Sequence, residues 1–415
     1  MTERIKRILR RRRFPWSKAV LACLGAVFVL GLVGLRVAAQ GPVPPTSGSG
    51  SSYVLLATPE TTHLGFFSAD LPPVLKVKSG DTVTFSTFPN VGEEARPGRS
   101  IEELVASADA LAKERNLIGP HSLTGPVYVE GAQPGDVLEI KVKDVVPSIY
   151  AGQIVFPGER NLGLLPEEFA EGTISHLYVD LSNGITQFAQ NVTLPVKPFM
   201  GIMGVAPPKD FEASNSEAGG AWEARPERID SYEGIKRVSS VPPDLWGGNM
   251  DNKEMVAGTS LFVPVFNEGA LFSTGDGHVN QANGEVGLTA SETAMRSVTL
   301  QFVVHKDMDL IRPVAETPDY FMTMGFDPDV DTAMKIATRD MLDLLVKSTG
   351  LSRLQAYSLA SLAMDLNITQ VVDINRGVHA LVPKSIFSGY TPVAQLKGAI
   401  QTALPATDQA PLAAS

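Results

Sequence analysis

The sequence has almost no cysteine, and this absence restricts the chemistry open to the protein. Its single cysteine, Cys23, lies in an apolar run from Ala19 to Leu35. Disulfides, thiolate nucleophiles and thiolate metal ligands are therefore excluded from the chain beyond this run. The sequence also has no Gly-x-Ser-x-Gly elbow and no Ser-Ser-Lys-type signature, which weakens a mechanism based on a serine nucleophile.

Positive charge is scarce beyond the N-terminus. Nine of the 35 Lys and Arg residues, but only one of the 45 Asp and Glu residues, lie in the first 39 positions. The rest of the chain therefore has 26 basic and 44 acidic residues, which gives a net charge of −18. A surface of this sign repels phosphate backbones, which argues against nucleic acid as a partner.

The first 39 residues have the features of an export signal. A basic segment precedes the apolar run, and two small residues, Val37 and Ala39, follow it. We expect cleavage after Ala39 and a periplasmic or extracellular protein, and Arg11-Arg12 also fits the twin-arginine export route. The alternative is an uncleaved membrane anchor, because the run is near the length that spans a bilayer. Only in that case would the membrane be a partner.

The rest of the chain predicts a mainly β fold, sandwich-like or barrel-like, with a smaller C-terminal α+β part. A flexible linker at 40–52 leads into residues 53–306, where short runs of Val, Ile, Thr and Phe alternate with Gly and Pro. Two pieces of this region, "LKVKSGDTVTFSTF" and "VYVEGAQPGDVLEIKVKDV", share a strand, a Gly-Asp turn and a second strand, which suggests a duplication. Residues 307–395 change to helical spacing, and residues 396–415 read as a loose tail.

Two capping boxes predict helices within this framework. Ser100 followed by Glu103 predicts a helix that runs to Glu114, and Ser352 followed by Gln355 predicts one that runs to about Leu366. The polar segment 207–243 predicts a long loop, a lid or a subunit-contact arm.

The stretch "ALFSTGDGHVNQANGEVG" holds the strongest candidate site. Asp276 and His278 are two residues apart, so on an extended strand both leave the same face about 7 Å apart and can share one divalent metal. Gln281 and Asn283 are suited to orienting the ligands. Without cysteine, a nitrogen-and-oxygen site favours zinc, with calcium as an alternative. The competing interpretation is a Gly-Asp-Gly turn beside a hydrogen-bonded histidine.

Two glutamates are candidates for moving protons. Asn283-Gly284 reads as a two-residue hairpin turn, which would leave Glu285 about 13 Å from His278. Glu285 is therefore a second-site or general-base candidate, with a solvated turn carboxylate as the alternative. Glu130, at the end of a β run, is a candidate acid or base, although a solvated strand end is the favoured interpretation.

Further polar residues lie in glycine-rich or proline-rich surroundings. His121, in "IGPHSLTGP", is the expected third metal ligand beside the aspartate and histidine above. Asn249 and Asp251, in "GGNMDNK", repeat the two-residue spacing next to glycines that allow close approach, although a plain loop fits equally well. His63 lies in a similar setting and is a candidate for substrate binding or ligand support.

Four segments together resemble the acetamidase/formamidase family of short-chain amide hydrolases. They are "TGPVYVEGAQPGDVLEIKV", "GIMGVAPP", "GGNMDNKEMVAGTSLFVPVFNEGALFSTGDGHVNQANGEVG" and "LSRLQAYSLASLAMDLNITQVVD". The resemblance implies a mostly β architecture, a homo-oligomer and a bound divalent metal. The family pattern after the histidine is close to H-A-A-Q-G-D-G-E, whereas this chain has Asn283 where the pattern has an acid.

These observations lead to one expected function and two alternatives. The expected function is a metal-assisted amidohydrolase that cleaves a formamide-like or acetamide-like amide to a carboxylate and ammonia, with Glu285 or Glu130 moving the proton. The acid missing at Asn283 keeps open an exported binding protein without catalysis. The long loop at 207–243 keeps open a hydrolase of a larger amide.

Overall fold

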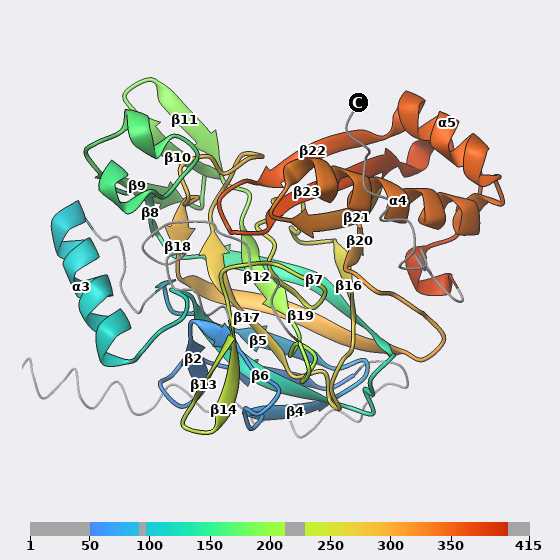
Figure 1. The fold of residues 1–415 in the computed structure, drawn as a ribbon, viewed down its shortest axis with the longest axis horizontal. Helices are drawn as coiled ribbons and strands as arrows, with labels where there is room; N and C mark the ends of the chain where they lie inside the picture. Colours follow the sequence, from blue (N-terminus) through green and yellow to red (C-terminus); the bar gives the residue numbers. More distant parts are fainter. Residues whose placement is uncertain (1–49, 91–96, 212–228, 397–415) are drawn as a thin grey trace, which may run out of the picture. The chain divides into compact units, whose positions relative to one another are not determined.

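The chain folds into two large sheets and one small one in the computed structural model, which describes residues 50–90, 97–211 and 229–396 (Figure 1). The nine-stranded sheet has the order β1 (Ser52–Leu55), β5 (Thr82–Phe85), β19 (Met295–His305), β7 (Val137–Pro147), β16 (Ser260–Pro264), β20 (Val314–Glu316), β21 (Tyr320–Asp327), β23 (Arg376–Pro383) and β22 (Asp365–Gln370).

The eleven-stranded sheet contains most of the functional candidates. Its order is β11 (Val192–Pro195), β10 (Ile185–Ala189), β9 (Thr173–Asp180), β8 (Tyr150–Val155), β18 (Glu292–Thr293), β17 (Phe272–His278), β12 (Phe199–Gly204) and β15 (Gly247–Asn249). From this path, β6 (Ser122–Glu130) pairs with β17, and β2 (Thr62–Leu64) and β4 (Leu75–Lys78) pair with β6. The small sheet has the order β13 (Ile229–Tyr232), β14 (Ile235–Ser239) and β3 (Phe66–Phe67).

The main hydrophobic core joins side chains from the two large sheets. Phe85 and Phe302 of the nine-stranded sheet meet Phe272 of the eleven-stranded sheet, with ring centroids 5.0–6.4 Å apart in edge-to-face pairs. Burial of each such ring stabilises the fold by about 1.5–3 kcal/mol. The prediction of a mainly β, sandwich-like fold is confirmed.

The repeated sequence pattern corresponds to two turns of the same geometry. Asp81 accepts a hydrogen bond from the Lys78 amide at 2.7 Å, and Asp136 accepts one from the Gln133 amide at 2.7 Å. The strands also correspond, because β4 pairs with β6 in parallel while β5 and β7 flank β19. The two pieces therefore occupy equivalent places in the sandwich.

The C-terminal part adds the predicted helices to the edge of the nine-stranded sheet. Helix α4 (Val330–Thr349) packs across β21 and β23, with Ala337, Met341 and Leu344 on its buried face, and helix α5 (Arg353–Ala363) packs against α4. The capping box at Ser352 is present. The prediction that this second helix continues to about Leu366 is wrong, because residues 365–370 pair with β23 as strand β22.

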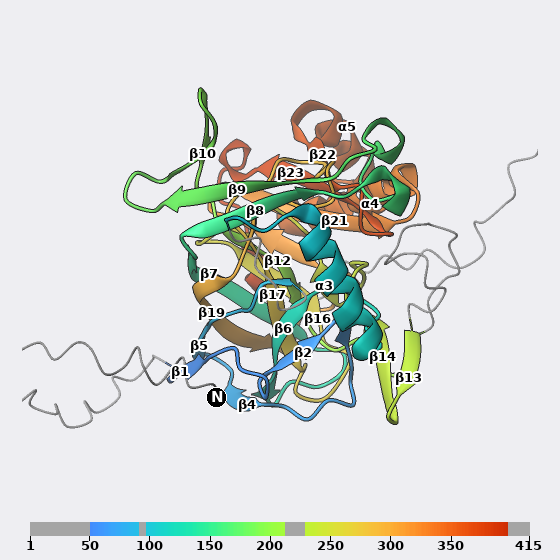
Figure 2. The same cartoon turned by 90° about the vertical axis from the view of Figure 1, so that its left-hand side faces the viewer.

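Helix α3 (Ile101–Glu114) confirms the other capping box, formed by Ser100 and Glu103. Its buried face, which includes Ile101 and Leu104, packs against Ile154 of β8. Figure 2 shows the helix in front of the sheets, with its upper end beside β8. Four short 3-10 helices complete the described elements: Gly158–Arg160, Pro166–Glu168, Lys384–Ile386 and Val393–Gln395.

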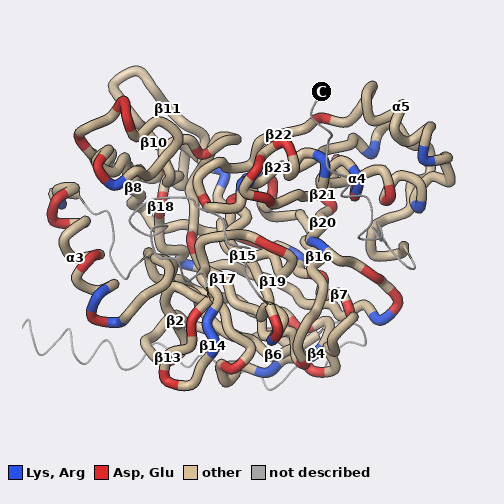
Figure 3. The backbone as a smooth tube through the Cα atoms, viewed as in Figure 1, with Lys and Arg blue, Asp and Glu red and all other residues tan. Residues whose placement is uncertain are grey.

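The polar segment 207–243 is only partly a loop. Residues 229–239 form the hairpin of β13 and β14, so the prediction of a continuous loop is wrong there, and residues 212–228 lie outside the described part. The export signal, most of the linker and nearly all of the predicted tail also lie outside it. Among the described helices, none is both long enough and apolar enough to span a membrane. Acidic and basic positions are interspersed over the sandwich and the C-terminal helices (Figure 3).

Candidate active site

Strand β17 carries Asp276 and His278 through the middle of the eleven-stranded sheet, and all seven of its residues are buried. Glycines flank the aspartate because the neighbouring strands leave no space. A Cβ atom on Gly275 would lie 2.2 Å from the Ser122 carbonyl oxygen, and one on Gly277 would lie 2.7 Å from the Thr293 carbonyl oxygen. Asp276 itself has a φ of 57°, so the strand is irregular at the point where its carboxylate enters the site.

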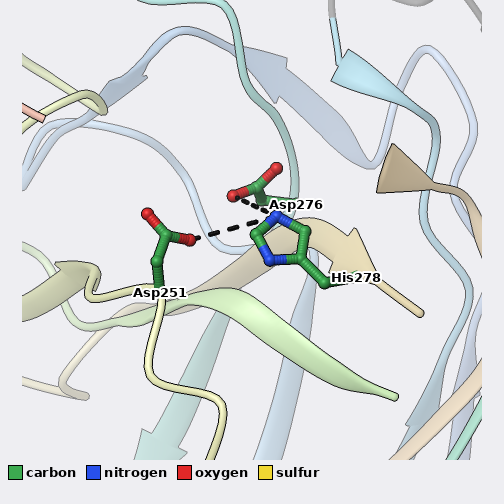
Figure 4. A group of neighbouring side chains, drawn as sticks. All are labelled: Asp251, Asp276 and His278. Atoms are coloured by element: carbon green, nitrogen blue, oxygen red, sulfur yellow. Dashed lines mark ion pairs between the residues drawn. The ribbon is translucent and has the colours of Figure 1, made fainter. Parts of the chain in front are cut away.

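The predicted pair of Asp276 and His278 does come together, with Asp251 beside it (Figure 4), and Glu292 joins the cluster as well. His278 Nε2 lies 3.3 Å from Asp276 Oδ2, 3.3 Å from Glu292 Oε1 and 4.0 Å from Asp251 Oδ1. The imidazole and the Asp251 and Asp276 carboxylates are almost completely buried. The sequence suggested only a supporting role for Asp251. The structure makes it a member of the cluster.

Gln281 fixes the tautomer of this histidine. Its Nε2 donates to the Asp251 carbonyl oxygen at 2.7 Å, which turns its Oε1 toward His278 Nδ1 at 2.9 Å. Because an amide oxygen only accepts hydrogen bonds, Nδ1 carries the hydrogen. Nε2 of the neutral ring therefore directs its lone pair at the carboxylates, which is the arrangement of a metal-binding histidine.

Glu285 contradicts the predicted hairpin. Strand β17 pairs with β18, with His278 opposite Glu292, and residues 279–291 form an irregular loop instead of a ladder. Glu285 is buried, has a φ of 44°, and brings its carboxylate to within 4.8 Å of ligand atoms of both His278 and Glu292. The distance of about 13 Å expected from the hairpin is therefore wrong.

A long-range contact explains this loop. The Gly284 amide donates to the Thr369 carbonyl oxygen at 3.0 Å, and the Val371 amide donates to the Gly284 carbonyl oxygen at 3.2 Å. The loop thus bonds to the end of β22, in a distant part of the sequence, and not to its own preceding strand. This attachment holds Glu285 over the cluster.

The cluster concentrates more negative charge than a protein interior normally holds. Burial raises the pKa of Asp251 to about 7 and that of Glu292 to about 7, and burial also raises the pKa of Glu285 and Asp373 well above their usual values. Burial disfavours the charged form of His278, but the Glu292 and Asp276 carboxylates outweigh it and raise the pKa of the imidazole. Without another cation, these groups must share protons.

The side chains present fit a divalent cation. Buried atoms without a hydrogen-bond partner include Asp251 Oδ1, His278 Nε2 and Glu285 Oε2. A cation would supply both the missing partner and the missing positive charge. Gly201 of β12 preserves the space, because a Cβ atom there would lie 2.3 Å from Asp251 Oδ1 and 2.4 Å from Asp276 Oδ2.

The other predicted site residues are dispersed. His121 lines the same pocket as the cluster and contacts Ser240 Oγ through Nδ1 at 2.8 Å, but it is not among the groups whose ligand atoms converge. Asn249 is buried in the pocket wall with Oδ1 unpartnered. His63 contacts Ser273 Oγ through Nε2 at 3.0 Å and is not among the residues that line the pocket.

Two predicted residues lie outside the site altogether. Glu130 is exposed at the end of β6, as the solvated-strand-end interpretation had it. Asn283 is exposed and donates to Asn367 Oδ1 at 3.2 Å. The residue that replaces the expected acid therefore does not face the cluster.

Sequence reasoning missed three residues that complete the site. Asp373 is a buried acid and Glu292 a partly buried one, and Asn90 donates to Asp276 Oδ1 at 2.6 Å and to Glu292 Oε2 at 3.3 Å. Asp373 follows the apolar stretch "ITQVV", and an acid directly after a buried run was the available signal. Neither Glu292 nor Asn90 has a distinctive sequence context.

The pocket above the cluster is polar at one end and apolar along its walls. The polar end holds the acids and His121, and the walls include apolar residues of α3, of β8, of the segment after β8 and of the loop after β17: Leu104, Val105, Ala108, Ile154, Phe156, Leu162 and Leu288. Such a pocket suits a small ligand with one polar group to be activated and one apolar part to be enclosed.

Comparison with known proteins gives a consistent result. Residues 57–389 match the model of the Acetamidase/Formamidase family. The chain is 29% identical over 237 residues to an acetamidase from Mycolicibacterium smegmatis, covering 49% of this chain and 57% of that protein. It is 25% identical over 370 residues to a formamidase from Methylophilus methylotrophus, covering 77% of this chain and 88% of that protein. The match thus spans less than two thirds of the length of the first of these relatives.

A solved structure shares the fold. The crystal structure of an acetamidase from Bacillus halodurans superposes with a TM-score of 0.66 at 27% identity, covering 80% of this chain and 98% of that one.

Proposed function

Because the chain belongs to the acetamidase/formamidase family, we propose that it hydrolyses a short-chain amide, such as formamide or acetamide, to the carboxylate and ammonia. The observation that carries the proposal is the buried cluster of Asp251, Asp276 and His278 at the polar end of a pocket. Amide hydrolysis needs an activated water, stabilisation of the developing oxyanion and a proton for the departing nitrogen.

Asp251, Asp276 and His278 would hold a divalent cation. When bound, the cation would polarise the amide carbonyl and lower the pKa of water. Zinc is the proposed ion, because the donor set combines imidazole nitrogen with carboxylate oxygen and contains no thiolate.

The surrounding side chains then have separate tasks. Gln281 holds His278 in the tautomer that presents Nε2. Asn90 holds the Asp276 carboxylate by its hydrogen bond to Oδ1. Glu292 lines the pocket with Oε1 3.3 Å from His278 Nε2, so its carboxyl group is placed to move a proton to the departing nitrogen. Glu292 takes this role from Glu130, which is exposed.

Ammonia release from formamide and acetamide tests the proposal directly. The purified protein is assayed as isolated, after treatment with a chelator, and after zinc is restored. We expect turnover that the chelator removes and zinc restores. Absence of turnover in every state would overturn the proposal for these substrates, and measurable amide binding without turnover would instead support the non-catalytic binding protein.

The apolar walls favour a second candidate, a hydrolase of a larger amide. Phe156, Leu162 and Leu288 enclose space that formamide would leave unfilled. Each methylene group that an amide buries there contributes about 0.8 kcal/mol. A series from acetamide to hexanamide separates the candidates: kcat/KM that rises with chain length supports the larger substrate, and kcat/KM that falls supports the short one.

Export and assembly are proposed alongside the activity. The basic segment and apolar run at the N-terminus support export of the protein. Family membership supports a homo-oligomer, which light scattering on the purified protein would test.

A further inference from the structure

We propose that the cluster holds a second divalent cation, bound by Asp251, Glu285 and Asp373. This inference rests on the proposed function for the first cation site, with which it shares Asp251. The second site would take a hard, oxygen-preferring cation such as Mn²⁺, Mg²⁺ or Ca²⁺.

The first observation is that three buried carboxylates converge on one point. One ligand atom from each of Asp251, Glu285 and Asp373 lies within 4.8 Å of the other two, and the group of Asp251, Asp276 and His278 meets the same criterion separately. The three acids come from different segments: the turn after β15, the loop after β17 and the turn after β22. Asp251 therefore belongs to both sets of candidate ligands, and its carboxylate can offer one oxygen to each cation.

The second observation is that buried carboxylate oxygens of this group lack hydrogen-bond partners. Glu285 Oε2 and Asp373 Oδ2 have no hydrogen-bond partner, although the two side chains are only 7% and 5% exposed. Buried carboxylate oxygens are normally satisfied, and two such oxygens left without a partner beside a third acid indicate a cation between them.

The backbone supports the same conclusion. Asp251 has a φ of 46° and Glu285 a φ of 44°, both in the left-handed region that residues other than glycine rarely adopt. Strain of this kind persists where the surrounding structure needs the side chain in one place, which is common at ligand sites. Here it directs two carboxylates toward Asp373.

Charge explains why one cation is insufficient. The cluster contains five carboxylates and one imidazole: Asp251, Asp276, His278, Glu285, Glu292 and Asp373. A single divalent cation offsets two of the five negative charges, and a second offsets two more. The two positions also differ in chemistry, because the first offers imidazole nitrogen and the second offers only carboxylate oxygen.

Counting bound metal tests the proposal without relying on activity. The protein is stripped with a chelator, saturated with Zn²⁺ and Mn²⁺ together, desalted, and analysed by mass spectrometry for metal per chain. We expect two cations in the wild type, one in Asp373→Asn and two in the control Asp365→Asn, an exposed acid at the start of β22. One cation in the saturated wild type, or an unchanged count in Asp373→Asn, would overturn the second site.

Two measurements keep the test decisive. Circular dichroism shows whether Asp373→Asn is folded, and if it is not, Glu285→Gln replaces it with the same expected loss of one cation. Amide hydrolysis is measured on the same samples. Two cations without turnover would leave the second site standing and overturn the proposed function, whereas turnover with one cation would overturn the second site alone.

Discussion

Replacing Gly201 by alanine should close the space on which the first cation site depends. The new Cβ atom would lie 2.3 Å from Asp251 Oδ1 and 2.4 Å from Asp276 Oδ2, whereas ordinary contact begins at 3.4 Å. Each oxygen must therefore retreat by roughly 1 Å, several times the tolerance of about 0.2 Å for a metal–ligand distance. Neither carboxylate has much room, because both are nearly completely buried and Asn90 holds Asp276 at 2.6 Å.

The expected losses differ in size for stability and for metal binding. An extra methyl group in a packed interior typically costs about 1–3 kcal/mol of unfolding free energy. Disturbing the support of a metal ligand costs about 10–100-fold in affinity, so displacing two ligands should cost at least about 100-fold, or roughly 3 kcal/mol of binding free energy. Gly201→Ala should therefore fold but bind metal poorly, and amide turnover should fall with occupancy.

The assay combines metal content, thermal unfolding and ammonia release. Gly287→Ala is the matched control, because a Cβ atom there meets only the side-chain amide of Gln153, at 3.0 Å. A folded Gly201→Ala protein with the metal content and kcat/KM of the wild type would refute the assignment of Asp251 and Asp276 as a pair of ligands.

Four further predictions test other parts of the structure. His278→Ala should abolish first-site metal and turnover with little change in thermal stability, whereas a large loss of stability with metal retained would favour a structural histidine. Gln281→Ala should lower zinc affinity about 10–100-fold in a binding titration, because it releases the His278 tautomer. Ser352→Ala should lower the free energy of unfolding by about 1 kcal/mol in a denaturant titration, through loss of the α5 cap. N-terminal sequencing of exported protein should begin at or near Gln40, and full-length protein found only inside the cell would contradict export.

The parts of the site that sequence reasoning found are those encoded locally. Asp276 and His278 are two residues apart in the glycine-rich stretch Gly275-Asp276-Gly277-His278, and Gln281 follows three residues later. Their proximity in space can therefore be predicted without knowledge of the fold. The helices at Ser100 and Ser352 were likewise predicted from capping boxes that involve only four residues.

The parts that were missed depend on distant segments. Glu285 was placed by a hairpin rule that compares it only with its own strand, while its position is set by two hydrogen bonds, from the Gly284 amide to the Thr369 carbonyl oxygen and from the Val371 amide to the Gly284 carbonyl oxygen. Asp373 arrives at the site through the same contact. Local patterns contain no information about such a bridge, so the convergence of Glu285 and Asp373 on the cluster could not be predicted from the sequence.

The bridge between the Glu285 loop and the end of β22 also sets the order in which the site can assemble during synthesis. The chain leaves the ribosome from its N-terminus, and all the described strands except β23 precede β22 in the sequence. Asp251, Asp276 and His278 are therefore made well before Asp373 and before the strand that holds Glu285 in place. A nascent chain stopped before Asp365 would lack both, which makes the completed centre a marker that translation has reached the C-terminal region.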